Sequence, residues 1–384
     1  MKIAGRLRDI EPFRVVEVLT RAKALEASGQ SIVHLEAGEP DFVTAEPIVE
    51  AAKRALDQGW TGYSQATGIP ELKRTLSDWY QDRYGLSIAP ERILITPGAS
   101  GALLLIASLL IDPGEGLLMA DPGYPCNRNF LRLVEGEGQL VPCDASTRYQ
   151  LTADIAAAAW RDNTRGVMVA SPANPTGEIL SRDELAALAA VCRQREGALI
   201  VDEIYHGLDY DSRACSVLEV EPEAFVLNSF SKYFGMTGWR LGWLVAPEWA
   251  VEPLERLAQN LFISMSTHAQ YGALAAFEDR TLETLEQRKR AFQDRRDYLF
   301  PELQQLGFGI PRRPAGAFYL YADCSELTDS ASRLAADLLG QAGVAVTPGI
   351  DFGHHRNDQH IRFAYTTGMP QLEDAVARIR RFLC

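Results

Sequence analysis

Seven short apolar runs along residues 92–245 restrict the possible folds of this chain more than any other feature. Several are apolar throughout instead of alternating with polar residues, which is typical of strands covered on both faces. Helical stretches separate most of the runs, and this alternation predicts parallel βαβ units. The sequence therefore predicts an α/β fold whose large domain has three layers around a seven-stranded, mostly parallel sheet. The runs are RILIT (92–96), GLLMA (116–120), QLVPC (139–143), GVMVA (166–170), ALIVD (198–202), FVLNS (225–229) and LGWLV (241–245).

The last connection of this predicted sheet differs from the others. The segment between Ser229 and Leu241 is short for a parallel crossover, so we expect the last strand to be antiparallel. After about residue 250 a long helical region leads into a smaller mixed segment with candidate strands at 316–323 and 360–365. We therefore expect a large domain over 38–280 and a smaller α+β domain built from both chain ends, 1–37 and 281–384.

Composition narrows the classes of partner. Of the 384 residues, 47% are hydrophobic, which is ample for a large core, and the net charge of −13 argues against a nucleic-acid or membrane-surface partner. The six cysteines are scattered without a C-x-x-C pair, as expected for reduced thiols. The N-terminus lacks the apolar core of a signal peptide, and the longest apolar stretch is too short to span a bilayer. We expect a cytoplasmic protein.

The stretch FVLNSFSKYFGMTGWRLGWLVA (225–246) contains the most unusual lysine of the chain. Lys232 lies just past a buried strand, among aromatic and small residues, with no acidic neighbour. Desolvation and a nearby cation lower the pKa of a lysine, which makes it a usable amine nucleophile. We therefore interpret Lys232 as a Schiff-base lysine, with Arg240 and Ser229 holding a phosphate; a solvated loop lysine is the alternative.

Ligands bind beyond the carboxyl ends of the strands in open parallel sheets. The turn PGASG (97–101) has small residues before a helix, so it is either an anion-binding turn or an ordinary strand–helix turn. Tyr124 follows the next strand and either stacks on a flat cofactor or packs internally. The loop SPANPTG (171–177), with two X-Pro bonds, predicts a rigid and potentially cis loop that presents Asn174, although a plain turn is also compatible.

Two further charges need partners. Asp202 ends a buried strand, where a carboxylate requires a cation or a donor, such as a protonated heteroaromatic nitrogen or a metal. A metal fits less well, because no histidine or carboxylate cluster has suitable spacing nearby. Arg362 lies on an apolar strand and requires a carboxylate, either from the protein or from a substrate. We interpret the group of His354, His355 and His360 as surface or loop residues.

Together these features indicate one ligand set: a phosphate, a flat ring with a basic nitrogen, an aldehyde for the lysine and a substrate carboxylate. Pyridoxal 5'-phosphate with an amino acid satisfies all four. With these residues assembled, the whole chain resembles the class I/II aminotransferases of the fold-type I pyridoxal-phosphate enzymes. The resemblance is carried by SFSKYFGMTGWRLGW (229–243), NPTG (174–177), DEIY (202–205), GEPDF (38–42) and GY-x-x-x-x-G-x-x-x-L (62–72).

The resemblance implies a role for each candidate residue. Lys232 forms the internal aldimine and shuttles the proton, Asp202 pairs with the pyridinium nitrogen, and Tyr205 and Asn174 bind the ring oxygen. Tyr124 stacks on the ring. Arg362, with Asn174 and the backbone at Gly38, binds the substrate carboxylate. The phosphate is held by Gly98, Ala99, Ser100, Ser229, Ser231 and Arg240, and by Tyr63 of a neighbouring subunit, which implies a homodimer with shared active sites.

The expected activity is ping-pong transfer of an amino group between an L-amino acid and a 2-oxo acid such as 2-oxoglutarate. Some aspartate-specific relatives carry a lysine where this chain has Ser100, and aspartate enzymes often have tryptophan in place of Tyr124. Both departures favour neutral or aromatic donors, with aspartate as an alternative. A carbon–sulfur β-lyase on the same scaffold is a second alternative. A non-catalytic pyridoxal-binding regulator is a third, and it would need a DNA-binding extension, for which no residues are available before residue 9.

Overall fold

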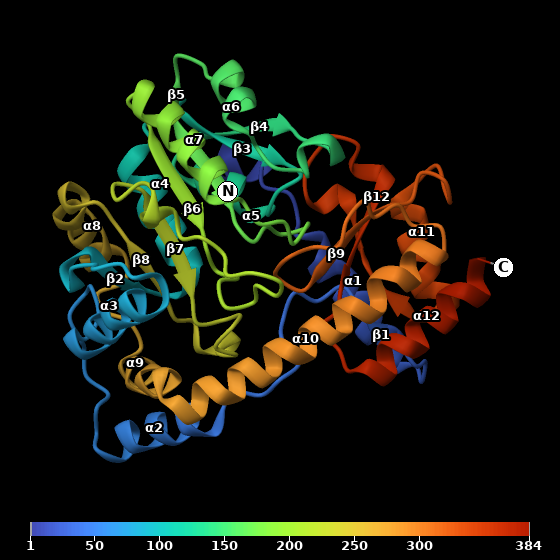
Figure 1. The fold of residues 1–384 in the computed structure, drawn as a ribbon, viewed down its shortest axis with the longest axis horizontal. Coiled ribbons are helices and arrows are strands. Elements are labelled where there is room, and N and C mark those ends of the chain that lie inside the picture. Colours follow the sequence, from blue (N-terminus) through green and yellow to red (C-terminus); the bar gives the residue numbers. More distant parts are fainter. Residues whose placement is uncertain (1, 384) are drawn as a thin grey trace.

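The computed structural model describes residues 2–383, and its centre is a seven-stranded sheet (Figure 1). The strand order is β2-β8-β7-β6-β5-β3-β4. Strand β8 is antiparallel to both of its neighbours, and the other pairs are parallel, which confirms the predicted antiparallel join. The strands are β2 (Ile93–Thr96), β3 (Gly116–Asp121), β4 (Glu137–Pro142), β5 (Thr164–Ala170), β6 (Ala198–Asp202), β7 (Phe225–Ser229) and β8 (Gly242–Val245).

Helices cover both faces of this sheet, which explains the uninterrupted apolar runs (Figure 1). In β5, Val167 and Val169 belong to one hydrophobic core, whereas Met168 between them belongs to the core on the other face. Residues 166–169 of this strand are all buried, so no polar alternation is needed there. The predicted three-layer α/β architecture is confirmed. The covering helices are α3 (Pro70–Tyr84), α4 (Gly98–Leu110), α5 (Cys126–Leu133), α6 (Ala153–Ala159), α7 (Arg182–Gln194) and α8 (Glu248–Leu261). Outside these layers, α9 (Thr267–Leu274) packs on α3, and α2 (Glu46–Asp57) packs on α9.

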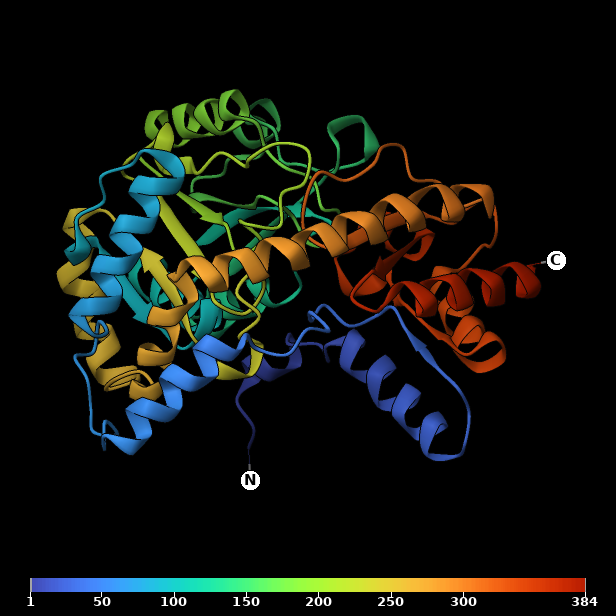
Figure 2. The same cartoon turned by 60° about the horizontal axis from the view of Figure 1, so that its bottom comes forward.

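The two chain ends meet in smaller sheets. Strand β1 (Val33–His34) pairs in parallel with β10 (Val344–Ala345), and β12 (His360–Ala364) lies between β11 (Thr347–Pro348) and β9 (Tyr319–Asp323) in an antiparallel sheet. Helices α11 (Ala331–Asp337) and α12 (Met369–Leu383) lie with these strands, and the long helix α10 (Asp279–Gln305) runs from them to the large sheet (Figure 2). The domain boundaries that we predict, 38–280 against the two chain ends, stay a prediction.

The roughly helical spacing of Val15, Val18, Leu19 and Leu25 predicts a helix over 9–29, and the helix in the structure begins later. Helix α1 spans Arg14–Ala27 and is preceded by Pro12 and the extended residue Phe13. Proline disfavours helical backbone in the residue before it, which excludes a helix that runs through 11–12. The carboxylate of Asp351 accepts the Arg14 and Val15 N–H groups at 2.9 and 3.3 Å and so caps α1 from the far end of the chain.

Candidate active site

A single cavity lies beyond the carboxyl ends of β5, β6 and β7, where the large sheet faces the antiparallel sheet of β9, β11 and β12. Most of the residues that the sequence singled out line it, although they are spread over more than 320 positions of the chain. Gly98 and Tyr63 are the exceptions. The predicted residues that line the cavity are Gly38, Ala99, Ser100, Tyr124, Asn174, Asp202, Tyr205, Ser229, Ser231, Lys232, Arg240 and Arg362.

Lys232 reaches the cavity from the loop that follows β7. Its Nζ donates a hydrogen bond to the backbone oxygen of Gly38 at 2.6 Å. Burial, together with the nearby Arg362 and Arg240 guanidinium groups, lowers the pKa of Lys232 to about 8, although Glu39 opposes the shift. About a tenth of this lysine is therefore a neutral amine at pH 7, far more than for an ordinary lysine, and a nucleophile or general base requires this form.

Asp202 is the last residue of β6 and is buried in the cavity. Among the described residues, the Ile204 N–H is its one hydrogen-bond donor, at 3.1 Å. Burial raises the pKa of Asp202 to about 7, since the ionised carboxylate is poorly solvated there. A cationic donor in the cavity would satisfy this carboxylate and keep it ionised.

The opposite end of the cavity is suited to an anion. Helix α4 begins at Gly98, so the backbone N–H groups of its first turn, including those of Ala99 and Ser100, are directed to this end. A Cβ at Gly98 would lie 2.8 Å from Arg240 Nη2, and the φ of Gly98 is +69°, so only glycine allows this approach. Ser229 Oγ lies 3.0 Å from Ser231 Oγ, and both hydroxyls line the same cavity.

Arg362 is a buried cation without an acidic partner within the described chain. It is 3% exposed, and its Nη atoms donate to Asn174 Oδ1 at 2.9 Å and to the Glu36 backbone oxygen at 2.6 Å. Its Nε has no hydrogen-bond partner. The guanidinium carbon lies 4.4 Å from the centre of the Tyr319 ring and 4.9 Å from that of Phe352. A buried, unneutralised guanidinium that lines a cavity is suited to a ligand carboxylate.

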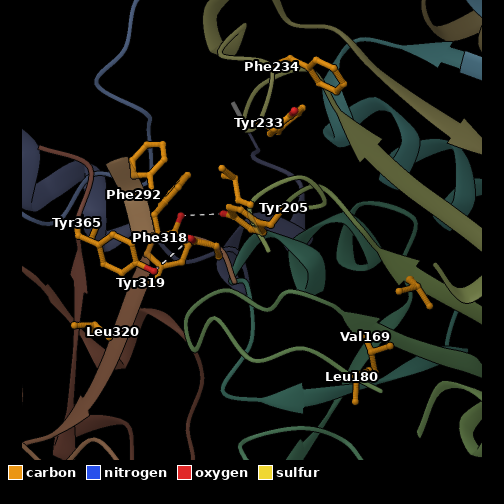
Figure 3. Close-up of a cluster of buried hydrophobic side chains, with 14 of the residues drawn as sticks. Val169, Leu180, Tyr205, Tyr233, Phe234, Phe292, Phe318, Tyr319, Leu320 and Tyr365 are labelled. Atoms are coloured by element: carbon orange, nitrogen blue, oxygen red, sulfur yellow. Dashed lines mark hydrogen bonds between the residues drawn. The ribbon is translucent and has the colours of Figure 1, made fainter. Parts of the chain in front are cut away.

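Tyr319 is a cavity residue that the sequence reasoning missed. Its hydroxyl lies 2.9 Å from the hydroxyl of Tyr205, and the two rings pack edge to face beside Phe318 (Figure 3). A Cβ at Gly38 would lie 2.3 Å from the Tyr319 hydroxyl oxygen, so this hydroxyl also packs on the segment that accepts Lys232. The motif GAFYLYAD predicts a strand but does not indicate which of its two tyrosines faces a ligand.

The N-terminal segment also reaches the cavity, and the sequence reasoning missed its residues. Phe13 and Val15 line the wall near Tyr124, and the Phe13 and Tyr124 rings pack edge to face with centroids 6.2 Å apart. No local signal in the sequence identifies them, because they depend on the cap that Asp351 provides to α1. Leu103, Ala170, Ile204 and Thr237 complete this set of unpredicted lining residues.

Gly98 and Tyr63 do not line the cavity, and the interpretation of His360 as a surface or loop residue is wrong. Tyr63 is 83% exposed and does not line the cavity of its own chain. His360, interpreted above as a surface or loop residue, is buried at the start of β12 and stacks on Tyr321 at 4.7 Å. His354 is exposed and His355 half-buried.

The peptide bonds before Pro172 and Pro175 are both cis. Within residues 2–383, no cluster of three or more His, Cys, Asp or Glu side chains could hold a metal ion, and no helix is long and apolar enough to cross a membrane.

Comparisons with known proteins agree with this geometry. A family model described as aminotransferase class I and II matches residues 30–379. The valine–pyruvate aminotransferase of Mycobacterium tuberculosis is 37% identical over 97% of each chain, and an aspartate aminotransferase of Geobacillus stearothermophilus is 32% identical over 100% of this chain and 99% of its own. The crystal structure of an aminotransferase from Mycobacterium tuberculosis superposes with a TM-score of 0.96 at 37% identity, covering 100% of this chain and 99% of the other.

The fold and the cavity define an enzyme of the fold-type I architecture, with its site at the carboxyl edge of the large sheet. The chain belongs to the class I and II aminotransferases, which act on amino acids and 2-oxo acids and depend on pyridoxal phosphate. The resemblance drawn from the sequence motifs is confirmed.

Proposed function

We propose that this protein uses pyridoxal 5'-phosphate to move an amino group between an L-amino acid, preferably neutral or aromatic, and a 2-oxo acid such as 2-oxoglutarate. The observation that carries the proposal is the arrangement of three charges in one cavity: the Lys232 amine, the buried Asp202 carboxylate and the unneutralised Arg362 guanidinium. A hydrolase or a simple binding protein needs no such set. An amino-acid substrate with a cationic, phosphorylated cofactor satisfies all three groups.

The residues present fit the cofactor. Among the described residues, the Ile204 N–H is the one hydrogen-bond donor to the Asp202 carboxylate, which would hold a protonated ring nitrogen. Arg240, Ser229, Ser231 and the first turn of α4 would hold the phosphate. Tyr124, which lines the same cavity, would stack on the ring, and the hydroxyl of Tyr205 would bind its oxygen. When bound, pyridoxal phosphate supplies a carbonyl carbon for amines and an electron sink for the charge that develops at the substrate Cα.

The chain's own groups then bind the substrate and move its proton. Arg362 anchors the α-carboxylate, helped by Asn174, so the Cα lies on the Lys232 side of the cavity. Lys232 Nζ accepts the Cα proton as general base and later returns it as general acid, because its lowered pKa suits both roles near neutral pH. Since the amino acid and the 2-oxo acid use the same carboxylate anchor in turn, we expect ping-pong kinetics.

The cavity wall supports the preference for neutral or aromatic side chains. Phe13, Val15, Leu103 and the Tyr124 ring make this wall largely apolar, and the cations among its lining residues are Lys232, Arg240 and Arg362, which already have roles. A second carboxylate on the substrate would lack a further cation among the described residues that line this cavity. Aspartate remains the second candidate donor, because a relative of 32% identity is an aspartate aminotransferase.

The test is a panel of single amino acids added to the purified holoenzyme without any 2-oxo acid. Conversion of the cofactor to its aminated form, read from its absorbance, reports the first half-reaction for each donor. We expect fast conversion by aromatic and branched neutral donors and slow conversion by aspartate. Addition of 2-oxoglutarate should reverse the spectrum. Release of pyruvate and ammonia from cystathionine without an oxo acid would instead favour the β-lyase alternative.

The homodimer is part of the proposal. Tyr63 is highly exposed and lies outside its own cavity, which is compatible with the expected contact to the cofactor phosphate of a neighbouring subunit. Val43, Leu56 and Trp60 are exposed apolar side chains of the same region, 43–63, and a second copy of the chain would cover them. The cytoplasmic location stays a prediction from the sequence.

A further inference from the structure

The backbone of residues 36–38 contacts both the proposed carboxylate anchor, Arg362, and the proposed catalytic amine, Lys232. Three consecutive carbonyl oxygens accept side-chain hydrogen bonds: Glu36 O from Arg362 Nη2 at 2.6 Å, Ala37 O from Thr366 Oγ1 at 2.8 Å, and Gly38 O from Lys232 Nζ at 2.6 Å. A shift of this segment would therefore displace the carboxylate anchor and the catalytic amine together. What fixes the segment is not explained by the proposed function.

The side chain of Glu36 is the strongest candidate for the group that fixes the 36–38 segment. It is completely buried, and one carboxylate oxygen lies 2.7 Å from His34 Nδ1. The other oxygen has no hydrogen-bond partner. Among the described residues, His34 is thus the one donor to a buried carboxylate, and removing the only partner of a buried charge is costly.

His34 is held in turn from the other side. Its Nε2 lies 3.2 Å from Glu26 Oε1 on α1, so both ring nitrogens face carboxylates. A neutral imidazole has only one N–H to donate, whereas the imidazolium has two. Only the cation satisfies both contacts, and Glu36, more than Glu26, raises the pKa of His34 to about 9.

We infer that His34 is a positioning residue: as an imidazolium it holds the buried Glu36 carboxylate, and so keeps the 36–38 backbone where it orients Arg362 and Lys232 for the substrate. This inference rests on the proposed function, because it assigns the substrate carboxylate to Arg362. Without the cation, the His34 ring can donate to only one of its two carboxylate partners, and the segment is held less firmly.

The first test compares His34→Gln and Glu36→Gln with the control Glu26→Gln, whose carboxylate is the exposed outer partner. Both inner variants should raise KM for the amino acid and for the 2-oxo acid about tenfold and should also lower kcat, by about threefold, because the displaced segment contacts both Arg362 and Lys232. The Kd of 3-phenylpropionate, which has a carboxylate but no amino group, should rise equally in a calorimetric titration of the holoenzyme. Glu26→Gln should change each value less than about twofold.

The pH profile separates positioning from mere structural support. The charged groups that face His34 are Glu26 from α1 and Glu36, while Arg378 of α12 binds the nearby Ser31 backbone and Asp374. The imidazolium is present below about pH 9 and is lost above it. The ratio of the Kd of 3-phenylpropionate in His34→Gln to that in the wild type should therefore fall toward one as the pH rises past 9.

Equal Kd values for His34→Gln and the wild type at neutral pH would overturn the inference, and so would a ratio that does not change with pH. If His34→Gln does not fold, the double variant His34→Gln/Glu36→Gln, which removes both buried charges, takes its place in the titration. Its Kd for 3-phenylpropionate should be no higher than that of Glu36→Gln, because His34 acts only through Glu36. A higher Kd would overturn the inference. A wild type that converts no amino acid would refute the proposed function, whereas the 3-phenylpropionate titration would still decide the role of His34.

Discussion

On the large-sheet side of the cavity, Asp202 and Lys232 follow directly from the neighbouring strands β6 and β7, whereas on the other side Arg362 depends on residues from the opposite end of the chain. The first pair is placed by a continuous parallel sheet with a core on each face. The guanidinium is placed by the Glu36 backbone oxygen, 326 positions away, and by Asn174.

This difference predicts that the two sides of the cavity have different roles, one in the chemical step and the other in substrate binding. Groups on the rigid sheet should govern the chemical step, because catalysis requires fixed donors and bases. Groups on the small-sheet side should govern binding of the carboxylate, and there the geometry depends on a few long-range hydrogen bonds. Substitutions on the two sides should therefore separate kcat from KM, and the predictions below test that separation in order of expected effect.

The largest effect is expected on the sheet side, for Lys232→Ala. Loss of the one lysine among the described residues that line the cavity should lower kcat by about 10⁴-fold, since nucleophile and general base are removed together. Stopped-flow absorbance of the first half-reaction measures this. Lys289→Ala, which changes another partly buried lysine that does not line the cavity, is the matched control and should leave the rate unchanged. A wild-type rate in Lys232→Ala would exclude this lysine from catalysis.

Asp202→Asn should lower kcat about 100-fold with little change in KM, because the neutral amide cannot keep the ring nitrogen protonated. The same change should stabilise the cofactor-free protein at pH 8. Burial raises the pKa of Asp202 to about 7, so ionising it costs folding free energy above that pH, on the order of a few kcal/mol.

This stability difference has a defined pH window. Asp202 is protonated in the folded protein below about pH 7, and in the unfolded chain only below about pH 4. The advantage of Asp202→Asn in urea unfolding should therefore be full above pH 7 and vanish as the pH falls to about 4. An advantage that is constant with pH would contradict the assigned cause.

On the other side of the cavity, Arg362→Lys should raise KM for both substrates about 30-fold and lower kcat much less. Lysine keeps the charge but loses the planar fork that binds a carboxylate through two hydrogen bonds. Steady-state kinetics with the best donor and 2-oxoglutarate measure the effect, and Arg380→Lys, on the exposed face of α12, serves as the control. Unchanged KM values would remove Arg362 from the substrate site.

The smallest effect is expected at the phosphate end, for Gly98→Ala. The added methyl group would lie 2.8 Å from Arg240 Nη2 at a backbone φ of +69°, so cofactor affinity should fall about tenfold while kcat at saturating cofactor stays close to normal. Equilibrium dialysis measures the Kd. Gly238→Ala, in the same loop as Arg240 and with nothing within 4 Å of the added Cβ, should leave it unchanged. Equal affinity in both variants would show that Gly98 is not needed for this approach.

The large-sheet side was predictable because local patterns encode it. An apolar run that ends in Asp202 or Ser229 places these residues at a sheet edge before any tertiary contact is known. The antiparallel strand β8 follows from the length of one connection. Chain length and hydrophobic pattern suffice for these features.

The small-sheet side was predictable only in part. The apolar surroundings of Arg362 indicated a buried guanidinium, but its neighbours Tyr319 and Phe352 come from other elements and have no local signature. His360 was misread because a histidine among polar loop residues gives no sign that it will stack on Tyr321. Phe13 and Val15 depend on a cap supplied by Asp351, more than 330 positions away.

The central claim is that Lys232 carries the cofactor, and reduction of the holoenzyme with borohydride followed by peptide mass spectrometry tests it most directly. The account predicts loss of the yellow colour and a reduced pyridoxyl phosphate label on the peptide that contains Lys232, and on no other lysine. A label on a different lysine, or full release of the cofactor after reduction, would contradict it.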